Sequence, residues 1–97
     1  MAFKNCNELL ETLEQYQQDY YTKGKALKIH NALTDVLPKL NFRNDKDSLE
    51  FYECYKNLKK IESLTNINEY SEKFAHNLLR LMLIVNNSKF SSEENYN

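Results

Sequence analysis

The chain has 97 residues, which fits one domain with a single core, since a domain of this size buries roughly 60 to 70% of its unfolded surface. Thirteen Lys and Arg against fourteen Asp and Glu give a formal net charge of -1. This balance excludes a whole-molecule field that would draw the chain onto nucleic acid or an anionic membrane.

The N-terminal segment turns polar after three residues and lacks the apolar stretch of a secretory signal. We therefore expect a cytoplasmic protein whose two cysteines stay reduced. The longest strictly apolar run, residues 81–85, is far shorter than the roughly 20 residues that span a bilayer. We expect no transmembrane segment, whereas a peripheral membrane contact stays open.

A first helix is predicted from apolar residues at helical spacing, interrupted only at Gln17. Asn5 or Asn7 is available as its N-cap. We expect the helix to end near Lys23, with Gly24, the only glycine of the chain, as its C-cap. The apolar positions are Cys6, Leu9, Leu10, Leu13, Tyr16 and Tyr20.

A second helix is predicted over about residues 25–37. Pro38 indicates where it ends, because proline lacks an N–H group and clashes with the preceding turn. The apolar stripe consists of Ala26, Ile29, Leu33, Val36, Leu37 and Leu40.

Residues 41–47 have the composition of a polar turn, after which Asp47 or Ser48 can cap a third helix over about residues 48–63. The apolar positions of this helix are Phe51, Cys54, Tyr55, Leu58, Ile61 and Leu64.

A fourth helix is predicted to begin at Asn66, which with Glu69 approximates a capping box. Apolar residues cover most of its circumference toward the C-terminal half, which is typical of the most buried helix in a bundle. We expect this helix to stop at Asn86 and Asn87, and residues 88–97 to form a flexible tail.

Four helices with connections of roughly 2 to 10 residues predict an all-α fold, an antiparallel four-helix bundle with up-down topology. The bundle would be a single domain over residues 1–87, followed by the flexible C-terminal tail. The sequence contains no pattern that predicts a strand.

The candidate binding surface lies at one end of this bundle, where the start of the second helix and the finish of the third helix meet. Two tyrosines flank the first apolar stripe, and six lysines would share that end. The predicted binding residues are Tyr16, Tyr21, Lys23, Lys25, Lys28, Lys56, Lys59 and Lys60. They could form a docking surface for an acidic protein segment, lipid headgroups or phosphates. Alternatively, they form a solvated end interleaved with Glu62, Glu69 and Glu72.

Nucleic acid is the least favoured of these partners. Outside the fourth helix the chain has one arginine, Arg43, and arginine is the preferred reader of base edges.

Cofactor and catalytic motifs are missing from the sequence. Cys6, His30, Cys54 and His76 fall one on each helix, but Cys6 and His30 would differ in height by roughly 15 Å. Zinc needs its ligands at about 2.0 to 2.3 Å. Neither a Gly-rich phosphate loop nor a GxSxG or HExxH motif occurs. We predict no metal site, no cofactor and no enzymatic activity.

Residues 67–82 read INEYSEKFAHNLLRLM, with an acidic residue before a tyrosine, another acid two positions further on, and then Asn-Leu. This segment is similar in pattern to the last helix of the enterocin A type among the immunity proteins that protect producers of pediocin-like bacteriocins. The resemblance implies a non-enzymatic protein that recognises a toxin-bound membrane receptor from inside the cell. It also implies that the last helix and the tail set specificity.

The sequence thus favours a small cytoplasmic helical bundle of the immunity or inhibitor type that acts by occupying a partner protein. The alternative is a nucleic-acid-associated regulator of plasmid, phage or host origin that uses the lysine-rich end. Whether the lysine-rich end or the fourth helix with the tail is the functional surface stays open at this point.

Overall fold

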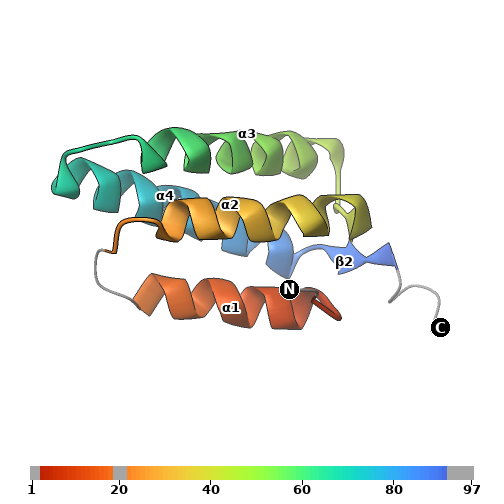
Figure 1. Ribbon diagram of the computed structural model, residues 1–97. Coiled ribbons are helices and arrows are strands. Elements are labelled where there is room, and N and C mark those ends of the chain that lie inside the picture. Colours follow the sequence, from red (N-terminus) through yellow and green to blue (C-terminus); the bar gives the residue numbers. More distant parts are fainter. Residues whose placement is uncertain (1–2, 19–21, 92–97) are drawn as a thin grey trace.

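The computed structural model describes residues 3–18 and 22–91, and within these ranges it contains four α-helices, a short 3-10 helix and two short strands (Figure 1). Each α-helix runs antiparallel to the one before it, which confirms the predicted all-α bundle. The elements are α1 (Cys6–Gln18), α2 (Lys25–Val36), a 3-10 helix (Leu37–Lys39), β1 (Leu40–Asn41), α3 (Asp45–Glu62), α4 (Ile67–Asn86) and β2 (Lys89–Phe90).

Asparagine side chains define the start of three α-helices in the described part of the chain. The side-chain oxygen of Asn5 accepts from Glu8 N at 2.9 Å, and that of Asn66 accepts from Glu69 N at 2.9 Å. These contacts confirm both asparagines as predicted caps. The prediction of Asp47 or Ser48 as the third cap is wrong, because Asn44 accepts from Asp47 N at 2.8 Å and α3 begins earlier.

The start of α2 has no side-chain cap of its own. Gly24 directly precedes it with a φ of 101°, a left-handed conformation that glycine adopts without strain. We had expected Gly24 to close the first helix, but its position serves the beginning of α2 instead. The other end of α2 agrees with the prediction, because the α-helix stops at Val36 and Pro38 lies in the 3-10 helix that follows.

Residues 88–91 belong to the folded domain, which corrects the expectation of a flexible tail from residue 88. Strand β2 pairs antiparallel with β1 in the register Leu40 to Phe90. The Phe90 side chain is only 1% exposed, and Ser91 Oγ donates to the Lys39 carbonyl oxygen at 3.2 Å. One large apolar side chain anchors this segment, and nothing in the local sequence pattern predicted the pairing. Residues 92–97 lie outside the described part.

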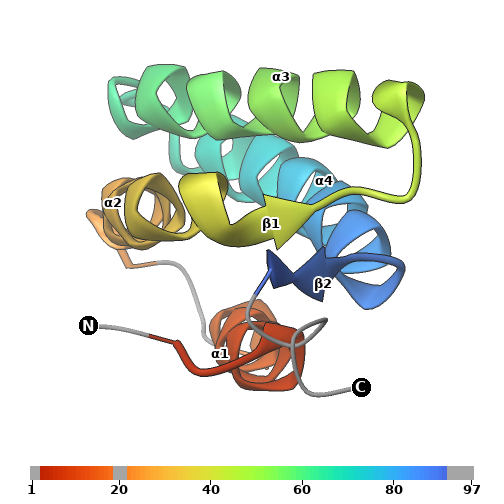
Figure 2. The same cartoon turned by 90° about the vertical axis from the view of Figure 1, so that its right-hand side faces the viewer.

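Neighbouring helices meet along four interfaces, here called seams, and at three of these seams the two helices are closely packed. Helix α4 packs against α3 and α1, and α2 packs against α3. Viewed along the bundle in Figure 2, α1 and α2 face each other across a wider gap than the other neighbours. The most deeply buried side chains include Leu9, Ile29, Phe51, Leu58, Tyr70 and Leu81. Tyr20, a predicted core residue, lies outside the described residues.

Candidate functional site

The predicted lysine-rich end exists, because the start of α2 and the finish of α3 lie together at one end of the bundle (Figure 1). Five of the six predicted lysines are exposed there: Lys23, Lys28, Lys56, Lys59 and Lys60. Lys25 is different, with only 7% of its surface exposed and its Nζ 4.5 Å from the centre of the Phe74 ring. Such a cation over an aromatic face stabilises the fold and is not available to a partner. Lys25 thus differs from the other predicted binding residues in being buried within this end of the bundle.

A hydrogen-bonded cluster surrounds Lys25 and explains why α2 needs no cap of its own. Tyr70 Oη accepts from Ala26 N at 3.1 Å and donates to Glu62 Oε1 at 2.8 Å. The same Glu62 oxygen accepts from Leu27 N at 3.2 Å. Side chains of α3 and α4 thus satisfy amide groups that the first turn of any helix leaves unpaired. Burial raises the pKa of Tyr70 to about 12, and the hydrogen bond to Glu62 acts in the same direction.

The exposed lysines of α3 extend along its outer face together with two apolar residues. Leu49 is 72% exposed and Tyr52 is also exposed, and both share a helix face with Lys56. The neighbouring Tyr55 instead turns toward α2, where its ring stacks on His30 with 4.2 Å between ring centres. Of these lysines, Lys60 also lines a pocket between α3 and α4 together with Lys73 and His76.

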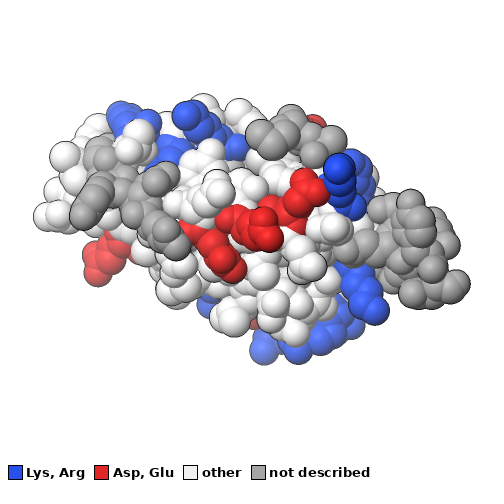
Figure 3. All heavy atoms as spheres, turned by 90° about the horizontal axis from the view of Figure 1, so that it is seen from below, with Lys and Arg blue, Asp and Glu red and all other residues white. Residues whose placement is uncertain are grey.

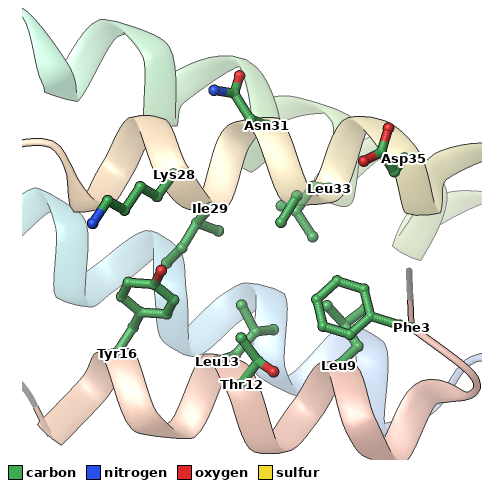
Figure 4. A pocket seen from close by; sticks show the side chains of 11 residues that line it. Phe3, Leu9, Thr12, Leu13, Tyr16, Lys28, Ile29, Asn31, Leu33 and Asp35 are labelled. Atoms are coloured by element: carbon green, nitrogen blue, oxygen red, sulfur yellow. The ribbon is translucent and has the colours of Figure 1, made fainter. Parts of the chain in front are cut away.

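Two of the predicted binding residues, Tyr16 and Lys28, meet in a groove between α1 and α2 (Figure 4). The groove has a volume of about 320 Å³. Its floor consists of buried residues from both helices, namely Leu9, Leu13, Ile29 and Leu33. Its rim consists of Thr12 and Tyr16 on one side and Lys28, Asn31 and Asp35 on the other. Tyr21, which we also predicted to bind, lies outside the described residues.

The outer face of α4 carries a pair of exposed leucines that the sequence reasoning missed. Leu79 is 48% exposed and Leu83 is 67% exposed, and their spacing of four residues places them on one face. We expected this half of α4 to be buried nearly all round. In fact Leu78 and Leu81 face the core, while Leu79 and Leu83 do not. Assigning the 3.6-residue period strictly, instead of counting apolar residues, would have separated the two sets.

Polar contacts flank this leucine pair on the side of α3. Arg80 Nη2 lies 3.0 Å from Glu50 Oε2, and Asn57 donates to the Asn77 side-chain oxygen at 3.2 Å. Behind them, burial raises the pKa of the Cys54 thiol, which disfavours the reactive thiolate.

Among the described residues, no group of His, Cys, Asp or Glu side chains is placed to hold a metal ion. Within the same residues, no helix is long and apolar enough to cross a membrane.

Comparisons with known proteins return no match: no protein-family model, no curated protein and no solved structure is significantly similar to this chain.

Proposed function

We propose that the protein is a non-enzymatic, cytoplasmic binding protein of the immunity or inhibitor type, which acts by occupying a partner protein. The observation that carries this proposal is the leucine pair on the outer face of α4, Leu79 and Leu83. The helix already buries its opposite side against α1 and α3, so the fold gains little from leucines at these positions.

The leucine pair has the chemistry of a protein contact. Fully burying a leucine is worth about 1.5 to 3 kcal/mol, so a partner that covers two half-exposed leucines gains roughly 2 kcal/mol from them. Exposed apolar side chains on one face of a rigid helix are suited to a partner helix or groove. Residues 67–82, which resemble the last helix of the enterocin A type immunity proteins, belong to the same helix and include Leu79 but not Leu83. A toxin-bound membrane receptor is accordingly the partner that we propose.

The alternative of a nucleic-acid-associated regulator has less support. Of the lysines on which it rests, Lys25 is buried against Phe74 and cannot reach a phosphate. Glu62, which lies at the same end, adds negative charge near the remaining lysines. Duplex DNA binding that falls steeply between low and physiological salt would nevertheless favour this alternative.

Site-specific photo-crosslinking tests the proposed surface in cells. A crosslinking amino acid at Leu83 should give an adduct of defined mass with one protein, and the change Leu79→Ser should abolish it. The matched control places the same amino acid at Leu49, an equally exposed leucine on α3. If position 49 gives the same adducts as position 83, the α4 surface is not the contact.

The immunity function needs a separate measurement. A strain sensitive to a pediocin-like bacteriocin should survive exposure when it expresses the parent chain, and should lose this protection with Leu79→Ser and Leu83→Ser combined. Leu49→Ser should protect as the parent does. If the parent gives no protection although the crosslink forms, the protein binds a partner but has another purpose.

A further inference from the structure

A pocket between α3 and α4 collects basic side chains near the end of the bundle where these two helices are connected. The pocket has a volume of about 320 Å³. Lys60 comes from the last part of α3, whereas Lys73 and His76 come from the first half of α4. The other lining residues are two asparagines and two apolar residues, so no acidic residue of the described chain lines the pocket. Its wall therefore carries positive charge.

The two asparagines supply hydrogen-bond donors to this pocket. Asn77 is only 7% exposed, and its side-chain nitrogen donates to the Lys73 carbonyl oxygen at 2.8 Å. Its side-chain oxygen accepts from the Asn57 side-chain nitrogen at 3.2 Å. An amide nitrogen has two N–H groups, so each asparagine keeps one that has no partner among the described residues. Buried polar groups are normally hydrogen-bonded, which indicates an acceptor in the pocket.

The acidic residues around the pocket leave its lysines available. Lys73 Nζ lies 3.8 Å from Glu69 Oε2, but both side chains are about half exposed, so solvent and salt weaken this ion pair. A smaller adjoining pocket, which shares both asparagines and the histidine, is lined by Glu50 and Glu53. There Arg80 Nη2 pairs with Glu50 Oε2 at 3.0 Å. An anion is therefore favoured on the lysine side and not on the side of the smaller pocket.

The side of the molecule formed by α1 has the opposite charge. Helix α1 contains Glu8, Glu11 and Glu14 but no lysine or arginine. Figure 3 looks from this side and shows acidic side chains across the middle, with lysine and arginine at the margins. Because the whole chain carries a formal charge of -1, any attraction for an anion must be local. The pocket between α3 and α4 provides such a local site.

We propose that this pocket binds a small soluble phosphomonoester, which is a phosphoryl group on a compact apolar body. A phosphomonoester carries a charge of about -1.5 to -2 at pH 7 and three acceptor oxygens. These match the charges of two lysines and the unpaired N–H groups of two asparagines. The apolar body would lie against Ile61 and Leu64, which also line the pocket. This inference goes beyond the proposed function, because neither Leu79 nor Leu83 lines this pocket.

Other ligands fit the pocket less well. A metal cation would be repelled by the two lysines and would meet no carboxylate among the lining residues. A carboxylate carries about half the charge of a phosphomonoester and fewer acceptor oxygens. A nucleic acid strand or a lipid surface presents many phosphates, which require a basic surface that extends well beyond one recess. The volume instead suits one small molecule, since ligand pockets begin at about 300 Å³.

Phenyl phosphate is the probe that tests this inference, in NMR titrations at physiological salt. It should bind at least about tenfold more tightly than benzoate or phenol, because hydrogen bonds between charged groups are the strong ones. Inorganic phosphate should bind more weakly than phenyl phosphate, since it lacks the apolar body. The side-chain amide signals of Asn57 and Asn77 and the ring signals of His76 should shift as phenyl phosphate saturates the site.

Matched charge removals separate the pocket from general attraction. Lys60→Gln with Lys73→Gln should weaken phenyl phosphate binding at least about tenfold. Lys39→Gln with Lys89→Gln changes the net charge equally at the opposite end of the bundle and should stay within about twofold (Figure 1). All four lysines are exposed, so both variants should fold. Leu64→Ala should weaken phenyl phosphate but not inorganic phosphate.

Several results would overturn the inference: no saturable binding of phenyl phosphate, equal affinity for benzoate, or equal losses in the two lysine variants. Vesicles of phosphatidic acid that bind although phenyl phosphate does not would identify a membrane contact instead. The double variant Leu79→Ser and Leu83→Ser should bind phenyl phosphate as the parent does. Failure of the α4 surface and failure of the pocket can therefore be told apart.

Discussion

The two seams of α2 are built in contrasting ways. Toward α3, aromatic and polar contacts join the helices: the His30 ring stacks on Tyr55, the Tyr55 hydroxyl hydrogen-bonds to Thr34, and Leu27 N donates to Glu62. Toward α1, the helix faces an open groove with an apolar floor. The contacts between α2 and α3, the closed seam, fix how the helices are placed. The seam between α1 and α2 is therefore free to stay open as a groove.

The largest expected effect concerns the apolar core behind the closed seam. Leu58→Ala in α3 removes a side chain with no exposed surface and should lower the free energy of unfolding by about 2 to 5 kcal/mol. Leu49→Ala on the same helix is the control, because a largely exposed leucine should contribute less than about 0.5 kcal/mol. Urea denaturation measures both, and similar losses in the two variants would contradict the placement of α3.

A smaller loss is expected from the cluster that caps α2. Tyr70→Phe removes the hydroxyl that pairs with Ala26 N and Glu62, and should cost about 1 to 3 kcal/mol because a buried amide loses its partner. Tyr55→Phe, which removes a more exposed hydroxyl, should cost less than Tyr70→Phe. Thermal and urea denaturation of both variants would show whether the Tyr70 hydroxyl at the start of α2 contributes more to stability than the Tyr55 hydroxyl between α2 and α3.

The same tyrosine predicts a dependence of stability on pH. The folded pKa of Tyr70 is about 12, above the value of about 10 expected in the unfolded chain. A raised pKa means that the stabilisation is complete below pH 10 and is lost between about pH 10 and 12. Over this range the free energy of unfolding of the parent should fall by up to about 3 kcal/mol more than that of Tyr70→Phe. If the free energy of unfolding falls equally steeply with pH in the two proteins, Tyr70 is not the cause of the pH dependence.

The smallest effect is expected in the open seam. Ala32→Leu adds apolar atoms where the groove leaves room, so the free energy of unfolding should stay within about 1 kcal/mol of the parent. Ala26→Leu is the contrasting change, because Ala26 is completely buried and overpacking there should cost about 1 to 3 kcal/mol. Should the two variants be destabilised equally, α1 and α2 would be packed as tightly as the closed seams.

The sequence predicted the fold class and the helices well, because apolar spacing and asparagine caps are local signals. Asn66 at the start of α4 and Pro38 after α2 are examples in which a few neighbouring residues determine the boundary. The candidate sites were harder. The burial of Lys25 depends on Phe74, which follows much later in the chain, and the groove depends on the spacing of two helices.

The exposed leucines of α4 illustrate a different kind of error. Their positions follow from helical periodicity, but an apolar residue on a predicted helix was assumed to face the core. The helix buries Phe74, Leu78 and Val85 on one side while presenting Leu79 and Leu83 on the other. Apolar residues around most of the circumference therefore marked a helix with two apolar faces, of which the fold buries one.

The pairing of β1 with β2 has a kinetic consequence. Phe90 near the end of α4 must find Leu40, which lies in the connection between α2 and α3, so this contact closes a long loop. Contacts between sequence-distant segments form late when local helices form first. During synthesis, α2 and α3 can associate while the segment that carries Phe90 has yet to leave the ribosome. The docking of this aromatic ring should therefore come late in folding, and Phe90→Ala should speed unfolding more than it slows folding.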